Sequence, residues 1–179
     1  QYRLDNYTDL SFEEYRVLNQ KIHSNGLSHP SFAVITHLSI AWSNHEALVI
    51  VCDTPKVRKF VYNYLTTTSK IQVWCNAPFD FKHIHYNTGL FPKTFIDVQY
   101  KAKTLINDAN PTRDRVGLKI IEGYAYGEWA LAKDKDKGES IFTLENMWDE
   151  EILKYAATDS CATFKYKEDL DEELSKWRM

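Results

Sequence analysis

The chain has 179 residues, 44% of them hydrophobic, which suits one well-cored domain and is too short for two. Its 22 basic and 25 acidic residues give a net charge of −3, which argues against a protein that coats nucleic acid through bulk electrostatics. The three cysteines are widely spaced, no apolar run is long enough to span a membrane, and the N-terminus does not resemble a signal peptide. We therefore expect a soluble, cytoplasmic protein with buried free thiols and no membrane contact.

The first thirty residues form a segment ahead of the main pattern. Ser11 and Glu14 have the spacing of a helix capping box, and Tyr15 and Leu18 follow at helical intervals. We expect a short helix here, within a single domain that extends over residues 1–179.

Two β-rich runs follow, residues 32–42 and 47–52, separated by the four residues Ser-Asn-His-Glu. A loop of this length between two such runs is typical of an antiparallel hairpin. Thr54 and Pro55 then open a helix that continues through Tyr64, because Thr is a favoured N-cap and Pro is favoured in the first turn. The apolar stripe of this helix is predicted to comprise Val57, Phe60, Val61 and Tyr64.

The remaining elements alternate between strand and helix. Residues 71–74 are predicted to form a buried strand, and residues 76–85 form a helix directly after it. One or two further helices are expected over residues 146–177, ending in a charged surface run. This order favours an α/β domain in which helices flank a mixed β-sheet.

Two segments carry candidate chemistry. Asp80 lies in the first turn of its predicted helix, and Tyr155 and Asp159 are four residues apart, which places them on one helical face. Two carboxylates from two helices suit a divalent cation, because hard cations prefer oxygen ligands. Simpler interpretations are that Asp80 favours the helix dipole, that Tyr155 is a core aromatic, and that Asp97 is the N-cap of the next helix.

The two segments also resemble known motifs. Residues 76–80 (NAPFD) and 155–159 (YAATD) resemble the second and third motifs of the DnaQ-like 3′-to-5′ exonucleases, in the subgroup with Tyr in the third motif. The proofreading exonuclease domain of phage-type family A DNA polymerases is similar over residues 31–174, including the region 116–127. The resemblance implies a ribonuclease H-like fold, with a mixed β-sheet flanked by helices.

It also implies an activity, which is the removal of nucleotides from the 3′ end of single-stranded DNA with two divalent metal ions, Mg²⁺ or Mn²⁺. By resemblance, Asp159 would ligate one ion directly, Asp80 would hold the other, and Tyr155 would orient the attacking water. Asn76 and Phe79 would contact the DNA strand, unless Asn76 caps its helix and Phe79 packs in the core. A polymerase domain in the same chain or complex, encoded by a phage, would be the partner.

The sequence departs from this family at its first motif. The family has Asp-x-Glu on its opening strand, and no such pair precedes the hairpin here. Residues 1–34 resemble an insertion that follows the motif in one phage-type subgroup, so the pair is expected upstream of Gln1; alternatively, Asp5 is its remnant or the pair is lost. Other interpretations are a catalytically impaired module that binds single-stranded nucleic acid or a polymerase partner, and an RNA-trimming exonuclease of the same superfamily.

Overall fold

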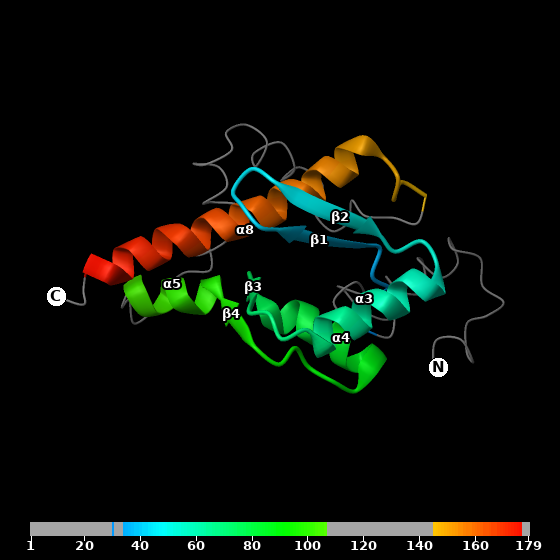
Figure 1. The fold of residues 1–179 in the computed structure, drawn as a ribbon, viewed down its shortest axis with the longest axis horizontal. Coiled ribbons are helices and arrows are strands. Elements are labelled where there is room, and N and C mark those ends of the chain that lie inside the picture. The colour runs from blue at the N-terminus through cyan, green and yellow to red at the C-terminus, as the bar shows by residue number, and fades with distance from the viewer. Residues whose placement is uncertain (1–29, 31–33, 107–144, 177–179) are drawn as a thin grey trace, which may run out of the picture.

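The computed structural model describes residue 30 and residues 34–106 and 145–176 (Figure 1). The capping-box helix and the region 116–127 lie outside these residues. No helix among the described residues is long and apolar enough to cross a membrane. The elements in chain order are β1 His37–Ala41, β2 Ala47–Val51, α3 Pro55–Thr67, β3 Gln72–Trp74, α4 Ala77–Thr88, β4 Phe95–Asp97, α5 Val98–Ile106 and α8 Glu150–Lys176.

The hairpin of β1 and β2 is confirmed, but β1 begins at His37, and residues 34–36, which were predicted to belong to it, are not in a strand. The strands pair antiparallel, with His37 opposite Val51 and Ala41 opposite Ala47. Successive side chains of a strand point to opposite faces, and this alternation places two different helix layers against the hairpin. Leu38 belongs to a core cluster with α3 and α4, whereas the hydroxyl of Ser39 lies 2.6 Å from that of Ser160 on α8. The hairpin therefore lies between α3 and α4 on one face and α8 on the other.

The second pair of strands, β3 and β4, is parallel and lies between the same layers. Gln72 pairs with Phe95 and Trp74 with Asp97. The Trp74 ring packs edge-on against Phe81 of α4, with centroids 5.3 Å apart. The neighbouring Val73 packs instead on a cluster formed by α5 and α8. Figure 1 shows α8 extending past both pairs of strands, and it contacts β1, β2 and β3.

The mixed α/β class is confirmed, but the strands of the described residues form two separate two-stranded sheets instead of one larger sheet. The strand predicted over residues 71–74 begins at Gln72 and is only partly buried. Ile71 is 63% exposed, so the prediction of a buried strand was wrong at this end. A short apolar run does not distinguish a fully covered strand from one that lies near a surface.

Helix α3 begins as expected. The Thr54 hydroxyl accepts a hydrogen bond from the Val57 amide, and Pro55 occupies the first turn. Its buried side chains, however, include Val61 and Leu65, whereas Phe60 is 60% exposed and Tyr64 is also exposed. The predicted stripe was therefore wrong for Phe60 and Tyr64. Two stripes on neighbouring sides of one helix were both apolar, and the fold buries the one that contains Val57, Val61 and Leu65.

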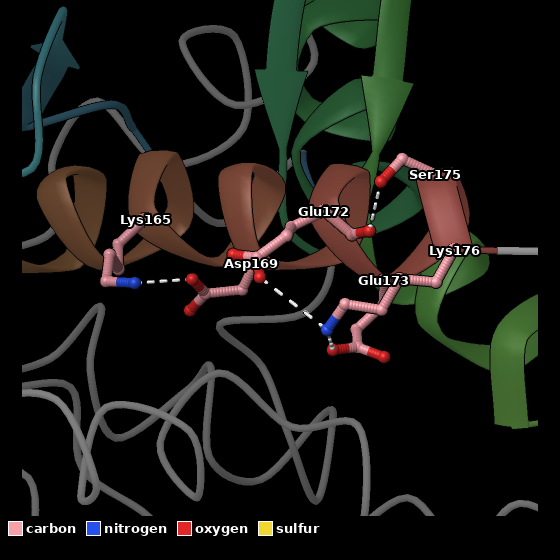
Figure 2. Close-up of polar contacts among 6 residues, drawn as sticks. All are labelled: Lys165, Asp169, Glu172, Glu173, Ser175 and Lys176. Atoms are coloured by element: carbon pink, nitrogen blue, oxygen red, sulfur yellow. Dashed lines mark hydrogen bonds and ion pairs between the residues drawn. The ribbon is translucent and has the colours of Figure 1, made fainter.

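Helix α8 has 27 residues and begins at Glu150, four residues later than predicted. Its C-terminal half is the expected charged surface run (Figure 2). Lys165 pairs with Asp169, and Lys176 lies 2.5 Å from Glu173 and 3.5 Å from Glu172. Such exposed pairs at helical spacing contribute about 0.3–0.5 kcal/mol each, so packing on the strands does most to hold α8 in place.

Candidate functional site

The junction between β3 and α4 lies where the carboxyl ends of the two parallel strands meet. Trp74 ends β3 opposite Asp97, which ends β4. Two residues later the chain turns at Asn76, whose φ of 64° lies in the left-handed region, and α4 begins at Ala77. Asparagine is among the few residues other than glycine that adopt this conformation readily. Asp80 stands in the first turn of α4, as predicted.

Asp97 binds the beginnings of two helices. Its Oδ1 atom accepts the Gln99 amide at 2.9 Å, which confirms the predicted N-cap of α5. The same carboxylate also reaches α4, where Oδ1 accepts the Asn76 amide at 3.2 Å and Oδ2 accepts the Ala77 amide at 2.8 Å. Asp97 is buried, so these three amides satisfy a charge that is largely removed from water.

The predicted capping role of the Asn76 side chain was wrong. Asn76 occupies the N-cap position of α4, but its side chain makes no capping hydrogen bond. A residue in the left-handed conformation does not have the extended backbone from which an N-cap side chain folds back onto the helix. The carboxylate of Asp97 takes over this task, and the Asn76 side chain is left exposed. The alternative role, contact with a substrate strand, stays a prediction.

The Asp80 carboxyl has an unusual environment. Burial raises its pKa from 3.8 to about 7, and the negative charge of Asp97 adds to the increase. The Asp80 backbone amide and Lys82 oppose the increase, but their effect is smaller. A bound divalent cation would stabilise the ionised carboxylate, because its positive charge offsets the cost of burying a negative charge. The donor chemistry of Asp80 therefore suits a metal ligand.

The segment that resembles the third motif, residues 155–159, lies on α8. Tyr155 is buried and Asp159 is partly buried, and the spacing of four residues puts both on one face of this helix. Tyr166 follows Asp159 by seven residues on the same face, about 10 Å along the axis. Tyr166 packs with Val98 of α5 and with Cys75 beside the end of β3, and burial raises its pKa to about 12. Asp159 is adjacent to Ser160, which contacts Ser39 of the hairpin, and both precede the residues of α8 that pack near β3.

Asp80 and Asp159 approach the strands from different layers. Asp80 belongs to α4, which packs on the face of β3 that carries Trp74, and Asp159 belongs to α8, which packs on the face that carries Val73. In the part of the chain that the structure describes, no three or more His, Cys, Asp and Glu side chains are grouped so as to hold a metal ion. A metal site shared by Asp80, Asp159 and further acids stays a prediction.

Phe79 is exposed beside this junction. Its ring is 44% exposed, so the alternative of core packing was wrong. The Lys82 Nζ lies 4.6 Å from the ring centroid, and the His83 ring lies 5.3 Å away. An exposed aromatic ring next to a cation is suited to contact a base and its phosphate.

The double role of Asp97 could not be found from the sequence. The spacing of Asp97 to the helix that follows it predicts an N-cap and nothing more. Its contact with Asn76 and Ala77 requires the parallel pairing of β3 with β4, which brings residues 20 and 21 positions apart together. A parallel register has no local sequence signature, so this link was visible only in three dimensions.

Comparison with protein-family models and with curated protein sequences gives no match for this chain. The functional interpretation therefore depends on the resemblance of the motifs at residues 76–80 and 155–159, and on the arrangement of the elements that carry them. Both the motif resemblance and the arrangement of these elements stand without similarity over the whole sequence.

Proposed function

We propose that this chain is the exonuclease domain of a DNA polymerase, with a ribonuclease H-like fold, and that it removes nucleotides from the 3′ end of single-stranded DNA. The observation that carries the proposal is that both strand pairs lie between the same two layers, α3 and α4 on one side and α8 on the other. In this arrangement Asp80 and Asp159 belong to helices on different sides of the strands, so the two carboxylates would have to meet at the carboxyl ends of β3 and β4 to share the cations. Motif resemblance supplies the reaction, and the layers supply its setting.

The two strand pairs have edges that another strand can bridge. Within the described residues, β1 pairs only with β2, and β3 pairs only with β4. Unpaired backbone groups at a sheet edge are ready to accept a further strand. A strand between β1 and β3 would join the two pairs into one mixed sheet. It would also lie beside the stretch of α8 that carries Asp159.

That bridging strand is where the missing Asp-x-Glu pair belongs. Side chains of one strand alternate between faces, so Asp-x-Glu places both acids on the same face. A strand from upstream of Gln1 would bring at least one more carboxylate to the site, whereas the alternative at Asp5 lies outside the described residues. The absence of a three-ligand group in the described residues is consistent with a site that is completed by this strand.

Each of the candidate residues would have its own role in the hydrolysis. Two divalent cations, when bound, would lower the pKa of a water toward ~7 and neutralise charge on the leaving 3′ oxygen. Asp159 and Asp80 would hold these cations. Tyr155, one turn before Asp159, would orient the water through its hydroxyl, which donates a hydrogen bond without ionising. Phe79 would receive the terminal base.

One observation favours a second candidate, which is a binding module without catalysis. The described residues contain carboxylates from the second and third motifs but no complete metal-ligand group. If the first pair is absent from the intact protein, the same surface would still hold a single strand or a polymerase partner. The experiment must therefore separate binding from cleavage.

The test is digestion of a 5′-labelled single-stranded DNA with Mg²⁺ or Mn²⁺. We compare the 179-residue chain, a chain extended upstream of Gln1, and the extended chain carrying Asp80→Asn or Asp159→Asn. Asp169→Asn is the matched control, because Asp169 is another carboxylate on α8 and belongs to the charged surface run. We expect digestion from the 3′ end by the extended chain and by its Asp169→Asn variant, and none by the 179-residue chain. Asp80→Asn and Asp159→Asn in the extended chain should each lower the digestion rate at least 100-fold.

The outcomes separate the two candidates. If every form binds the strand and none digests it, the exonuclease proposal fails and the binding module replaces it. If the motif variants digest as fast as the control, Asp80 and Asp159 are not metal ligands. Digestion of RNA in place of DNA by the same extended chain would favour the RNA-trimming alternative.

A further inference from the structure

Helices α3 and α4 each have an exposed side that faces away from their shared core. The buried side chains of both helices, Val61 of α3 and Phe81 of α4 among them, belong to one core cluster that lies against the hairpin. Their opposite sides consequently face away from that core, and Figure 1 shows the two helices on the same side of β1. We name the α3–α4 outer surface by six residues, Lys59, Phe60, Tyr64, Phe79, Lys82 and Tyr86.

The aromatic rings of this surface are exposed, although the apolar pattern of α3 predicts burial for two of them, Phe60 and Tyr64. Phe60 is 60% exposed, and Tyr64, Phe79 and Tyr86 are 36%, 44% and 43% exposed. Phe60 and Tyr64 are four residues apart, and Phe79 and Tyr86 are seven apart, so each pair lies on one side of its helix. Helices α3 and α4 thus each expose two large rings on the side away from the core.

The charge of this surface differs from that of the rest of the protein. Helix α3 contains Lys56, Arg58 and Lys59 and no acidic residue, and α4 contains Asp80 as its one acid. Helix α8, on the other side of the strands, carries eight acidic residues against four lysines, or −4. The net charge of −3 for the whole chain therefore hides a basic layer opposite an acidic one. Overall charge had argued against nucleic-acid binding only because it averages the two.

We propose that the α3–α4 outer surface binds single-stranded nucleic acid, with bases stacked on its rings and phosphates next to its lysines. Phe79 directly precedes Asp80 in the first turn of α4, so the surface would hold the strand behind its 3′ end. The proposal rests on the proposed function for the identity of the strand, and the test below separates the two.

Charge and ring geometry together favour this partner. Every base has a π-face that stacks on an aromatic side chain, and every linkage has a phosphate that attracts a lysine. Phe79 and Lys82 are one pair of exposed ring and cation, with Nζ over the ring and 4.6 Å from its centroid. A second copy of this chain would present acidic α8 to the same lysines, so it is an alternative occupant that the test must detect.

The experiment measures binding of a fluorescent single-stranded DNA of about 12 nucleotides, in EDTA so that no cleavage occurs. The variants are Phe60→Ala, Tyr86→Ala and Lys59→Ala in the 179-residue chain. The control is Tyr100→Ala on α5, because Tyr100 is also exposed and Lys103 lies 5.1 Å from its ring centroid, an equivalent pair outside the surface. Each ring variant should raise the Kd about tenfold, and the control should leave it within twofold.

The lysine variant has its own signature. Removing one phosphate contact reduces the slope of log Kd against log salt concentration by about 0.7. Cleavage by the extended chain supplies a second readout, in which the ring variants should impair a strand of about 12 nucleotides more than a trinucleotide. If the extended chain cleaves no DNA but the surface variants still bind DNA more weakly than the Tyr100→Ala control, the proposed function is wrong and the proposed binding surface is supported.

Two results would overturn the proposal. Binding that is unchanged in all three variants, each with an unfolding temperature like that of the unmodified chain, would show that the strand lies elsewhere. Self-association of the unmodified chain that the same variants abolish, measured by sedimentation without DNA, would show that the surface is an interface between copies.

Discussion

The Oδ2 atom of Asp97 accepts the backbone amide of Ala77 at 2.8 Å, which links the end of one strand to the start of the helix that carries Asp80. The same carboxylate caps α5 through Gln99. One buried side chain thus fixes two helix beginnings at the carboxyl ends of two parallel strands. The first prediction concerns this link.

Asp97→Ala should lower the free energy of unfolding by about 3 kcal/mol, because it removes an N-cap and leaves buried amides without an acceptor. Asp97→Asn retains one acceptor oxygen and should lower it by roughly half as much. Chemical denaturation measures both values, with Glu168→Ala on the exposed side of α8 as the control, expected within about 0.5 kcal/mol. Equal stability of Asp97→Ala and the control would contradict the structural role.

The second prediction concerns pH and Asp80. Its pKa is about 7 in the folded protein and 3.8 without the fold, so between these values the folded state binds more protons than the unfolded state. The contribution of Asp80 to stability therefore falls as pH rises from about 4 to 7 and is constant above that range. Asp80→Asn should remove this fall and stabilise the protein above pH 7 by on the order of 2 kcal/mol, less than the full shift implies because the carboxyl is not wholly shielded from water.

Thermal unfolding at several pH values in EDTA measures the effect. The difference between Asp80→Asn and the unmodified chain should be small near pH 4 and should grow toward pH 7. Asp53→Asn, an exposed Asp at the end of β2, is the control and should not change the profile. A difference that is the same at every pH would mean that Asp80 titrates near its ordinary pKa.

The third prediction concerns the turn before α4. Asn76 has a φ of 64°, which glycine adopts freely and a β-branched residue does not. Asn76→Gly should therefore change the free energy of unfolding by no more than about 0.5 kcal/mol, whereas Asn76→Val should lower it by about 1–2 kcal/mol. Equal effects of the two substitutions in chemical denaturation would contradict the left-handed conformation.

The fourth prediction compares two neighbours on α3. Val61 of α3 is fully buried in the core cluster that includes Leu38 of the hairpin, whereas Phe60 is 60% exposed. Val61→Ala should lower the free energy of unfolding by about 2 kcal/mol through the cavity it leaves, although it removes a smaller group than Phe60→Ala does. Phe60→Ala should change it by no more than about 0.5 kcal/mol. The reverse order would mean that the helix is rotated relative to the core.

Local sequence pattern was enough to predict several elements. The hairpin loop, the capping of α3 by Thr54, the helix that carries Asp80 and the N-cap at Asp97 all depend on residues a few positions apart. Each is decided by backbone preferences and hydrogen bonds within one or two turns, so the information lies in consecutive residues. The three cysteines were likewise predicted to be buried free thiols; Cys52 and Cys161 are buried, whereas Cys75 is only partly buried.

The errors have a common cause. Phe60 and Val61 are adjacent and equally apolar, and only the position of the hairpin decides which one is buried. Phe79 and Phe81 differ in the same way, since Phe81 packs on Trp74 whereas Phe79 faces outward. Helical periodicity gives relative angles on a helix, but the direction of the core comes from elements far away in the chain.

The consecutive residues of this protein specify its helices, its hairpin and the two motifs that resemble an exonuclease. Tertiary structure alone decided that both strand pairs lie between the same layers, that Asp97 joins α4 to α5, and that exposed rings and lysines gather on the outside of α3 and α4. The physical reason is that register between parallel strands and the choice of a buried helix face depend on contacts between distant segments, whose energies do not appear in any short stretch of sequence.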